Sequence, residues 1–361
     1  LFITLLSMRN SVFGWIDVCL YERRICQTKV HPRPVFILGH PRTGTTLLHS
    51  LLALDEEKFA VCTTFCAGFP SSFLFLERFK SWLSNVMDET RPMDNVPLHF
   101  DLPQEDELAT NLLSDGTCSP YMPLFFMPQE PSYRPFYAFD DDAKGDESLP
   151  PEQMASARKR WTDAFLYLLQ KLTLRSQLHC GQNQAGETAL CRRLLLKSPV
   201  HTARIPLLLQ LFPDAQFIYI HRHPYDVFQS AAHMADTTYW YTYLQTPSDD
   251  QILEFVLRQY EILWQRYDSA RAILKPHQLV QVSYDELTER PVATLERIYQ
   301  QLEWKLDNRV RQCWQEQTKG SYQRNRHAEL SPQLRQVLDN RWGPSFDQLG
   351  YTRQGTTTSS L

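Results

Sequence analysis

One stretch near the start of the chain constrains the fold more than any other: an apolar run at residues 35–38, a turn with two glycines, and an amphipathic segment. The apolar run predicts a buried strand and the segment after the turn predicts a helix. Four leucines are spaced for one side of that helix: Leu47, Leu48, Leu51 and Leu52. A strand, a glycine turn and a helix N-terminus form an anion cradle, because backbone N–H groups and the helix dipole favour negative charge. The spacing from Gly39 to Gly44 is that of a nucleotide P-loop, yet Thr45 stands where that motif has its lysine, and the loop's cation is Arg42.

Bulk composition excludes several classes of protein. The chain has 361 residues, of which 43% are hydrophobic, and its formal net charge is −4. The apolar content is enough for the core of a large α/β domain. An acidic chain whose arginines and lysines are dispersed is not expected to bind nucleic acid. Cys62 and Cys66 have a loose metal-like spacing, but no second cysteine or histidine pair matches them, so we predict no metal site.

Strand and helix patterns alternate along the rest of the chain. Apolar runs predict strands at 194–197, 217–220 and 279–282, and helical patterns cover 152–178, 202–211, 250–272 and 291–302. This alternation predicts an α/β fold of three layers, with a mostly parallel sheet and helices on both faces. Residues 131–151 are expected to form a surface loop. We divide the chain into an N-terminal helical segment (1–30), a single domain (31–353) and a disordered tail (354–361).

A second anion site is predicted where the strand at 217–220 ends. Arg222 follows that strand, and Ser230 lies in the second turn of the helix that Pro224 begins. Ligands bind at the carboxyl ends of strands in open α/β sheets, so the guanidinium and the hydroxyl could converge on one anion. The alternative is an ion pair between Arg222 and Asp226 that stabilises the helix start. Together with the glycine turn, the first interpretation calls for a ligand with two anionic groups.

These motifs resemble those of sulfotransferases that use 3′-phosphoadenosine 5′-phosphosulfate (PAPS). Residues 41–46 (PRTGTT) resemble the 5′-phosphosulfate loop of that family, and residues 222–230 resemble its 3′-phosphate motif. Residues 103–107 (PQEDE) and 282–287 (VSYDEL), with arginine at position 42, are similar to a broad bacterial and algal group related to the tyrosylprotein sulfotransferases. The resemblance runs from about residue 33 to 305. It implies a P-loop-like fold, PAPS as co-substrate and no metal.

The resemblance also implies roles for particular residues. Lys197 would neutralise charge on the leaving phosphate, beside Arg42; the alternative for Lys197 is a surface lysine. The residues expected to bind the cofactor are Arg42, Thr43, Gly44, Thr45, Thr46, Arg222, Ser230, Tyr284 and Lys319. Sulfuryl transfer needs positioning and charge stabilisation at the bridging oxygen, as phosphoryl transfer does, and these cations would supply both.

Three residues are candidates for the base that takes the acceptor's proton. Glu105 lies in the segment where the broad group supplies a carboxylate; the alternative for Glu105 is an acidic residue that complements a helix dipole. His99 and His201 are the other two candidates. Cytosolic members place a histidine two residues after the equivalent lysine, and that position holds Pro199 in this chain. This departure favours Glu105.

The acceptor is expected to be apolar. Aromatic residues are dense at 59–140, and although most are expected in the core, some could line a pocket for a small apolar alcohol, a lipid or a sterol. A P-loop kinase and a non-catalytic nucleotide-binding protein are the alternatives. The chain does not begin with methionine, so membrane association is expected only through a missing N-terminal segment. A cytoplasmic location is favoured, with a Golgi membrane anchor as the alternative, and the sequence does not predict an oligomeric state.

Overall fold

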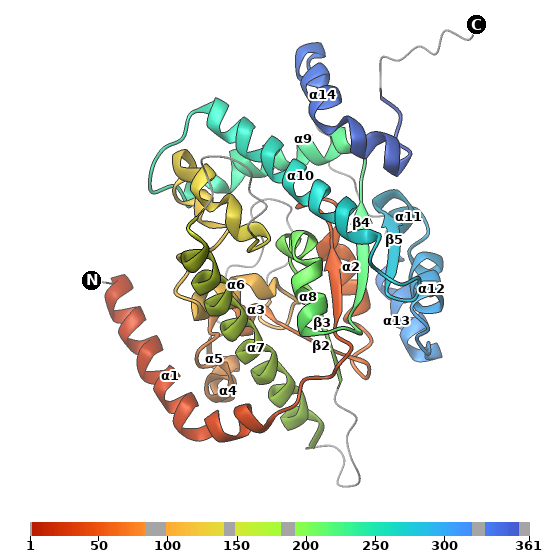
Figure 1. Ribbon diagram of the computed structural model, residues 1–361. Coiled ribbons are helices and arrows are strands. Elements are labelled where there is room, and N and C mark those ends of the chain that lie inside the picture. Colours follow the sequence, from red (N-terminus) through yellow and green to blue (C-terminus); the bar gives the residue numbers. More distant parts are fainter. Residues whose placement is uncertain (1, 84–98, 141–148, 182–191, 320–328, 354–361) are drawn as a thin grey trace, which may run out of the picture.

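Five parallel strands form the centre of the computed structural model, which describes residues 2–83, 99–140, 149–181, 192–319 and 329–353. Figure 1 shows them as one twisted sheet between layers of helices. The order across the sheet is β2 (Phe59–Val61), β3 (Arg193–Lys197), β1 (Val35–Leu38), β4 (Gln216–His221) and β5 (Leu279–Ser283). Neighbouring strands all pair in parallel, so their carboxyl ends meet at one edge.

Alternate side chains of the strands enter two separate cores. Phe36, Leu196 and Phe217 share one core with α1 (Phe2–Gln27), α7 (Pro151–Gly181), α8 (Ile205–Leu211), α9 (Pro224–Thr237), α10 (Asp249–Arg271) and α14 (Pro332–Leu349). Ile37, Ile218 and Val282 share the other core with α2 (Thr45–Leu52), α11 (Tyr284–Glu289), α12 (Pro291–Gln301) and α13 (Asn308–Gln317). Helices therefore cover both faces, which confirms the predicted three-layer α/β fold.

Short elements link β2 to α7 and complete the first layer. They are α3 (Thr64–Gly68), α4 (Phe73–Leu76), α5 (Lys80–Leu83), α6 (Asp106–Leu113) and 3₁₀ turns that include η1 (Glu77–Phe79), η3 (Met122–Leu124) and η4 (Met127–Tyr137). Two further 3₁₀ turns are η5 (Pro199–Ala203), between β3 and α8, and η6 (Tyr239–Tyr241), after α9. The dense aromatic residues of this region lie mostly in the core, as expected; Phe65, Phe73 and Phe136 are buried, whereas Trp82 is exposed.

Several sequence predictions need correction. The helices predicted at 152–178, 250–272 and 291–302 are α7, α10 and α12, but the helix predicted from residue 202 begins only at Ile205, after η5. The surface loop predicted at 131–151 is wrong for its first part, because η4 extends to Tyr137 and the carbonyls of Phe136 and Tyr137 accept hydrogen bonds from the buried Arg204. Residues 141–148 and the predicted tail at 354–361 lie outside the described residues.

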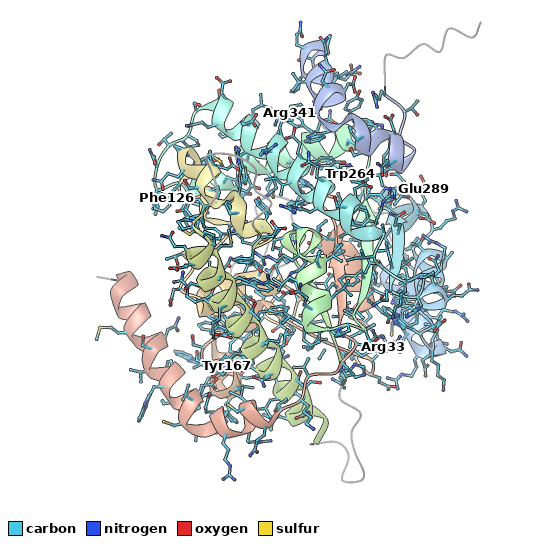
Figure 2. The ribbon with its side chains drawn as sticks, viewed as in Figure 1. Arg33, Phe126, Tyr167, Trp264, Glu289 and Arg341 are labelled. Carbon is cyan, nitrogen blue, oxygen red and sulfur yellow. The ribbon has the colours of Figure 1, made fainter. Side chains whose placement is uncertain are left out.

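The N-terminal helix α1 is attached to the body of the molecule through a buried ion pair. Lys171 of α7 lies 2.5 Å from Asp17 of α1, and both side chains are at most 1% exposed. The same ammonium group donates to the carbonyls of Pro70 and Ser71, 2.9 Å away. Beside it, the Tyr167 hydroxyl donates to Glu22 of α1; Figure 2 labels Tyr167 on the side of α7 that faces this helix. Among the described residues, we find no helix whose length and apolar content would let it cross a membrane.

We predict that breaking this buried pair on one side only is strongly destabilising. Lys171→Met leaves the Asp17 carboxylate buried without its cation, which should lower the free energy of unfolding by about 3–5 kcal/mol. The double variant Asp17→Asn/Lys171→Met removes both charges and keeps an acceptor for the Phe75 N–H, so it should be more stable than Lys171→Met alone. Urea unfolding followed by circular dichroism measures both. Equal stability of the single and double variants would contradict the prediction.

Candidate active site

The turn between β1 and α2 has the backbone geometry of an anion cradle. Gly39 and Gly44 have φ values of 146° and 96°, in the region that favours glycine. A Cβ atom on Gly39 would lie 2.5 Å from the carbonyl oxygen of Ile220, and one on Gly44 would lie 2.5 Å from the ring of Tyr284. Both glycines are therefore required by close packing as well as by conformation. Arg42 also has a positive φ of 74°, a strained conformation of the kind found at functional sites.

The threonines of this turn have distinct environments. Thr43 donates its hydroxyl to the carbonyl of His40, 2.8 Å away, which tightens the turn. Thr45 is the buried first residue of α2 and occupies the position of the P-loop lysine. The Thr46 hydroxyl lies 3.5 Å from the ammonium group of Lys197, on the neighbouring strand β3. The cation beside the helix start therefore comes from β3 and not from the loop.

The second predicted anion site lies next to the first. The Nε of Arg42 donates to the hydroxyl of Ser230, 3.0 Å away, so the two motifs are in direct contact. The Arg222 guanidinium lies 4.5 Å from the centre of the Tyr284 ring. Its Nε is buried and makes no hydrogen bond among the described residues, although Asp226 Oδ2 is 3.4 Å away. The ion pair considered as the alternative thus exists, and another nitrogen of the same guanidinium lies 3.5 Å from the carbonyl oxygen of Arg42 in the turn.

Lys197 and Glu105 form the centre of the site. The Lys197 ammonium donates to Glu105 Oε1 at 2.9 Å, and its side chain is only 2% exposed. The Tyr121 hydroxyl donates to the other carboxylate oxygen at 2.7 Å and lies 3.1 Å from the Ser198 hydroxyl. Burial and the nearby charge of Glu105 raise the pKa of Tyr121 well above its ordinary value, so its hydroxyl remains a donor. The Glu105 side chain is 22% exposed, which leaves it accessible to a substrate.

Two more acidic residues follow Glu105 in the chain, and each pairs with a basic residue that follows Lys197. We call this set the acid–base ladder: Glu105 with Lys197, Asp106 with His201, and Glu107 with Arg204. The Asp106 carboxylate lies 2.6 Å from His201 Nε2 and also accepts the backbone N–H of Lys197 at 2.9 Å. Burial would raise the pKa of Asp106, but the His201 charge and hydrogen bonds outweigh it and the pKa is lowered.

The structure separates the three candidate bases. Glu105 contacts Lys197, whereas His201 is completely buried, with Phe36 and Phe165 packed around its ring. The His99 ring is 64% exposed and accepts the backbone N–H of Asp101; among the described residues we find no contact between His99 and Lys197 or Glu105. Of the three, Glu105 alone combines a partly exposed side chain with a direct hydrogen bond to the proposed catalytic lysine.

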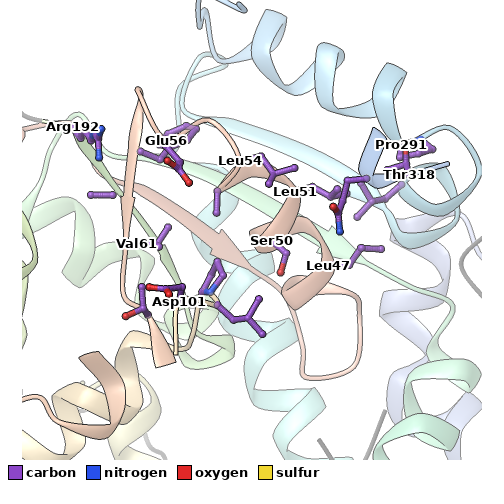
Figure 3. A pocket seen from close by; sticks show the side chains of 18 of the residues that line it. Leu47, Ser50, Leu51, Leu54, Glu56, Val61, Asp101, Arg192, Pro291 and Thr318 are labelled. Atoms are coloured by element: carbon purple, nitrogen blue, oxygen red, sulfur yellow. The ribbon is translucent and has the colours of Figure 1, made fainter. Parts of the chain in front are cut away.

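A cavity of about 1220 Å³ opens beside α2. Figure 3 shows Leu47, Ser50 and Leu51 on α2 facing it, with Asp101 on another side. Leu287 of α11 also lines it, as do Thr318 and Lys319 after α13. Lys319 thus borders this cavity, and its side chain is exposed. The basic residues that follow Lys319 lie outside the described residues.

The sequence prediction missed several residues of the site. Tyr121 falls in the aromatic-rich region at 59–140 and Asp106 in the segment at 103–107, but neither pattern assigns it a contact with Lys197, Glu105 or His201. Thr202 was also missed; its hydroxyl accepts the Gly39 N–H at 2.9 Å and so holds the start of the turn. The sequence does carry one signal for these contacts: acidic residues cluster at 105–107 and basic residues cluster at 197–204. Which acidic residue pairs with which basic residue becomes clear only from the fold.

Comparison with known proteins agrees with the geometry. A model of the sulfotransferase family matches residues 34–308. Two curated proteins from Mycobacterium bovis and Mycobacterium tuberculosis, both named omega-hydroxy-beta-dihydromenaquinone-9 sulfotransferase Stf3, are 32% identical over 356 residues. These alignments cover 97% of this chain and 83% of each relative. The match spans most of the chain, and the chain belongs to the sulfotransferase family.

Solved structures of the same class share the fold. The crystal structure of sulfotransferase STF1 from Mycobacterium tuberculosis has a TM-score of 0.62 at 20% identity, and covers 84% of this chain and 75% of its own. The structure of STF9 from Mycobacterium avium has a TM-score of 0.59 at 17% identity, and the alignment covers 95% of this chain and 82% of the STF9 chain. The P-loop-like α/β fold implied by the sequence motifs is therefore confirmed. The family model and the relatives at 32% identity confirm the enzyme class: the chain is a sulfotransferase, of a family that uses PAPS.

We predict that the turn tolerates no side chain at Gly44. Gly44→Ala forces an alanine into a left-handed conformation and pushes its methyl group against Tyr284, which should lower the free energy of unfolding by about 1–2 kcal/mol or more. Gly68→Ala is the matched control, because a Cβ there meets nothing within 4 Å. Urea unfolding of both variants is the measurement. The explanation fails if the two substitutions change stability equally.

Proposed function

We propose that this protein transfers the sulfuryl group of PAPS to the hydroxyl of a lipophilic acceptor, with Glu105 as base and Lys197 and Arg42 as the cations of the transfer. The observation that carries the proposal is the position of Lys197, whose ammonium group contacts both Glu105 and Thr46 of the anion turn. A single lysine thus links the proposed base to the proposed phosphosulfate site. The two anion sites nearby match a cofactor with a 5′-phosphosulfate and a 3′-phosphate.

The residues present fit such a cofactor. Backbone N–H groups of the turn, with Thr45 and Thr46, would hold the 5′ phosphosulfate, as oriented amides at a helix start bind anions. Arg222, with its planar guanidinium, and Ser230 would hold the 3′-phosphate. Tyr284 packs against both Gly44 and Arg222, so it can fix the position of either site relative to the other. Of the residues expected to bind the cofactor, Lys319 alone lines the cavity beside α2.

The transfer requires two things of the protein: it must accept the proton of the acceptor hydroxyl, and it must stabilise the negative charge on the leaving phosphate. When bound, the co-substrate supplies the sulfuryl group: a bond forms between the acceptor oxygen and sulfur as the bond from sulfur to the bridging phosphate oxygen breaks. Glu105 takes the acceptor's proton, and Lys197 and Arg42 stabilise the negative charge left on the phosphate. Because each Glu105 oxygen accepts one hydrogen bond in the structure, each keeps a lone pair for that proton.

A lipophilic alcohol is the acceptor class we favour. The mycobacterial relatives are named for omega-hydroxy-beta-dihydromenaquinone-9, a lipid that carries a hydroxyl group, and they match 97% of this chain. Beside Glu105 the chain places the aromatic ring of Tyr121, whose hydroxyl bonds to the carboxylate. Aromatic side chains of this kind line pockets for apolar substrates.

We predict that the protein binds adenosine 3′,5′-bisphosphate in preference to ATP. The turn carries Thr45 in place of the lysine that would pair with the ATP phosphates, whereas Arg222 and Ser230 form a site for a 3′-phosphate that ATP lacks. Isothermal titration with adenosine 3′,5′-bisphosphate and, separately, with ATP and Mg²⁺ should show at least about tenfold tighter binding of the former, or 1.4 kcal/mol. Tighter binding of ATP would support the kinase alternative and overturn the proposal.

We also predict that Glu105, and not His99, is the base. Glu105→Gln keeps the size and the hydrogen-bonding shape of the side chain but cannot take a proton, so kcat should fall about 10²–10⁴-fold. His99→Gln should leave kcat within about twofold, because its ring is exposed and lies apart from Lys197. The assay follows transfer of labelled sulfate from PAPS to a lipid extract, read by mass spectrometry.

Binding of adenosine 3′,5′-bisphosphate by both variants is the control for folding and cofactor affinity. If Glu105→Gln binds the nucleotide normally and still turns over, Glu105 is not the base. If neither the parent protein nor the variants transfer sulfate to the lipid extract although they bind the nucleotide, the proposed acceptor class is contradicted.

A further inference from the structure

The outer side of α1 is an exposed apolar surface with basic residues at one end. Five apolar side chains on this helix are between 43% and 69% exposed: Met8, Val12, Trp15, Val18 and Leu20. Met8, Val12 and Trp15 recur at four- and three-residue spacing, so they form one stripe along the helix. Arg23 follows just over two turns after Trp15 and is exposed. The stripe faces away from the body of the molecule, since the side that holds Asp17, Tyr21 and Ile25 is buried.

The helix cannot rotate to bury the stripe, because the opposite side of α1 is held against the body of the molecule by buried polar contacts. Asp17 is paired with Lys171 of α7, and its carboxylate also accepts the N–H of Phe75 at 2.7 Å. The Tyr21 hydroxyl accepts a hydrogen bond from Arg78 at 2.8 Å. Figure 1 shows α1 at the periphery, with α4, α5 and α7 on one side of it. The helix therefore presents its apolar stripe to the surroundings in the folded protein.

The charges on α1 are distributed asymmetrically. Its two acids both have partners within the molecule, because Asp17 is buried against Lys171 and the half-buried Glu22 accepts a hydrogen bond from Tyr167. Among the described side chains of α1, the exposed charged residues are Arg23 and Arg24, and the exposed Lys29 follows the helix. A second copy of α1 packed on the stripe would bring no exposed acid to these arginines. An anionic surface would complement them.

We propose that α1 binds the surface of an anionic lipid bilayer, with Val12 and Trp15 inserted at the interface and Arg23 and Arg24 against the headgroups. A peripheral helix with an apolar stripe, an exposed tryptophan and basic flanking residues has the composition of an interfacial membrane helix. On the other side of α1, Phe13 packs against Phe75 at 6.0 Å, which helps to keep the stripe facing outward. The inference rests on the proposed function in one respect: an acceptor dissolved in a bilayer would be reached from this surface.

The test is flotation of the full chain with vesicles of phosphatidylcholine, with and without about 30% phosphatidylglycerol. The parent protein should float with the anionic vesicles and be released by about 0.5 M salt, which screens the arginines. Val12→Ser/Trp15→Ser should lower the binding constant about tenfold or more, and Arg23→Glu/Arg24→Glu should do so on anionic vesicles. Matched controls are Ile273→Ser, an exposed apolar residue after α10, and Arg309→Glu/Arg311→Glu on α13; both should bind as the parent does.

Three results would overturn the proposal: no flotation of the parent protein, equal losses in the α1 variants and the controls, or a dimer in light scattering that Val12→Ser/Trp15→Ser dissociates while vesicle binding is absent. The last result would assign the stripe to a second copy of the chain. Titration of the same samples with adenosine 3′,5′-bisphosphate keeps the two proposals apart. Nucleotide binding without flotation contradicts only the membrane surface, and flotation without nucleotide binding contradicts only the proposed cofactor.

Discussion

The site depends on the acid–base ladder, which ties one segment of chain to the end of a central strand. Each pair is supported by further hydrogen bonds: Arg204 donates to two backbone carbonyls, Glu107 accepts from Trp161, and Asp106 accepts the N–H of Lys197. Buried ion pairs are costly unless such bonds satisfy the remaining donors and acceptors. The Glu107–Arg204 pair is satisfied in this way, and the Asp106 carboxylate bonds to both His201 and the Lys197 N–H, so these two buried pairs can hold the partly exposed Glu105–Lys197 pair in a defined position.

The acid–base ladder can position Glu105 because the segment of chain that precedes Glu105 is also fixed by hydrogen bonds. The backbone from Phe100 to Gln104 bonds to residues near the start of α3, where the Thr64 and Phe65 N–H groups donate to the carbonyls of Leu102 and Phe100. The Gln104 N–H donates to the carbonyl of Cys62, which follows β2. Glu105 is therefore fixed from both sides, by β2 through the backbone and by β3 through ion pairs. A base fixed in this way loses little freedom when a substrate binds.

The sequence predicted those parts of the site that depend on local pattern. The glycine turn, the helix begun by Pro224 and the strand ahead of Lys197 follow from apolar runs and turn residues close together in the chain. The pairing of acids at 105–107 with bases at 197–204 could not be predicted, because it is set by the sheet order and spans about 90 residues. Tyr121 was not singled out for the same reason: only the fold shows that its hydroxyl reaches Glu105. β2 was missed since three residues give too short a pattern.

Sheet register explains why a threonine can replace the P-loop lysine at position 45. Lys197 pairs with Ile37 across the sheet, and both side chains point to the face that α2 covers, so the lysine reaches Thr46. A shift of one residue in this register would turn Lys197 to the opposite face, away from the turn. The Asp106 carboxylate, which binds the Lys197 N–H, sits at the end of the strand and resists such a shift. The cation of the site is thus specified by strand pairing and a side-chain cap, and the glycine turn needs to supply only its backbone, its threonines and Arg42.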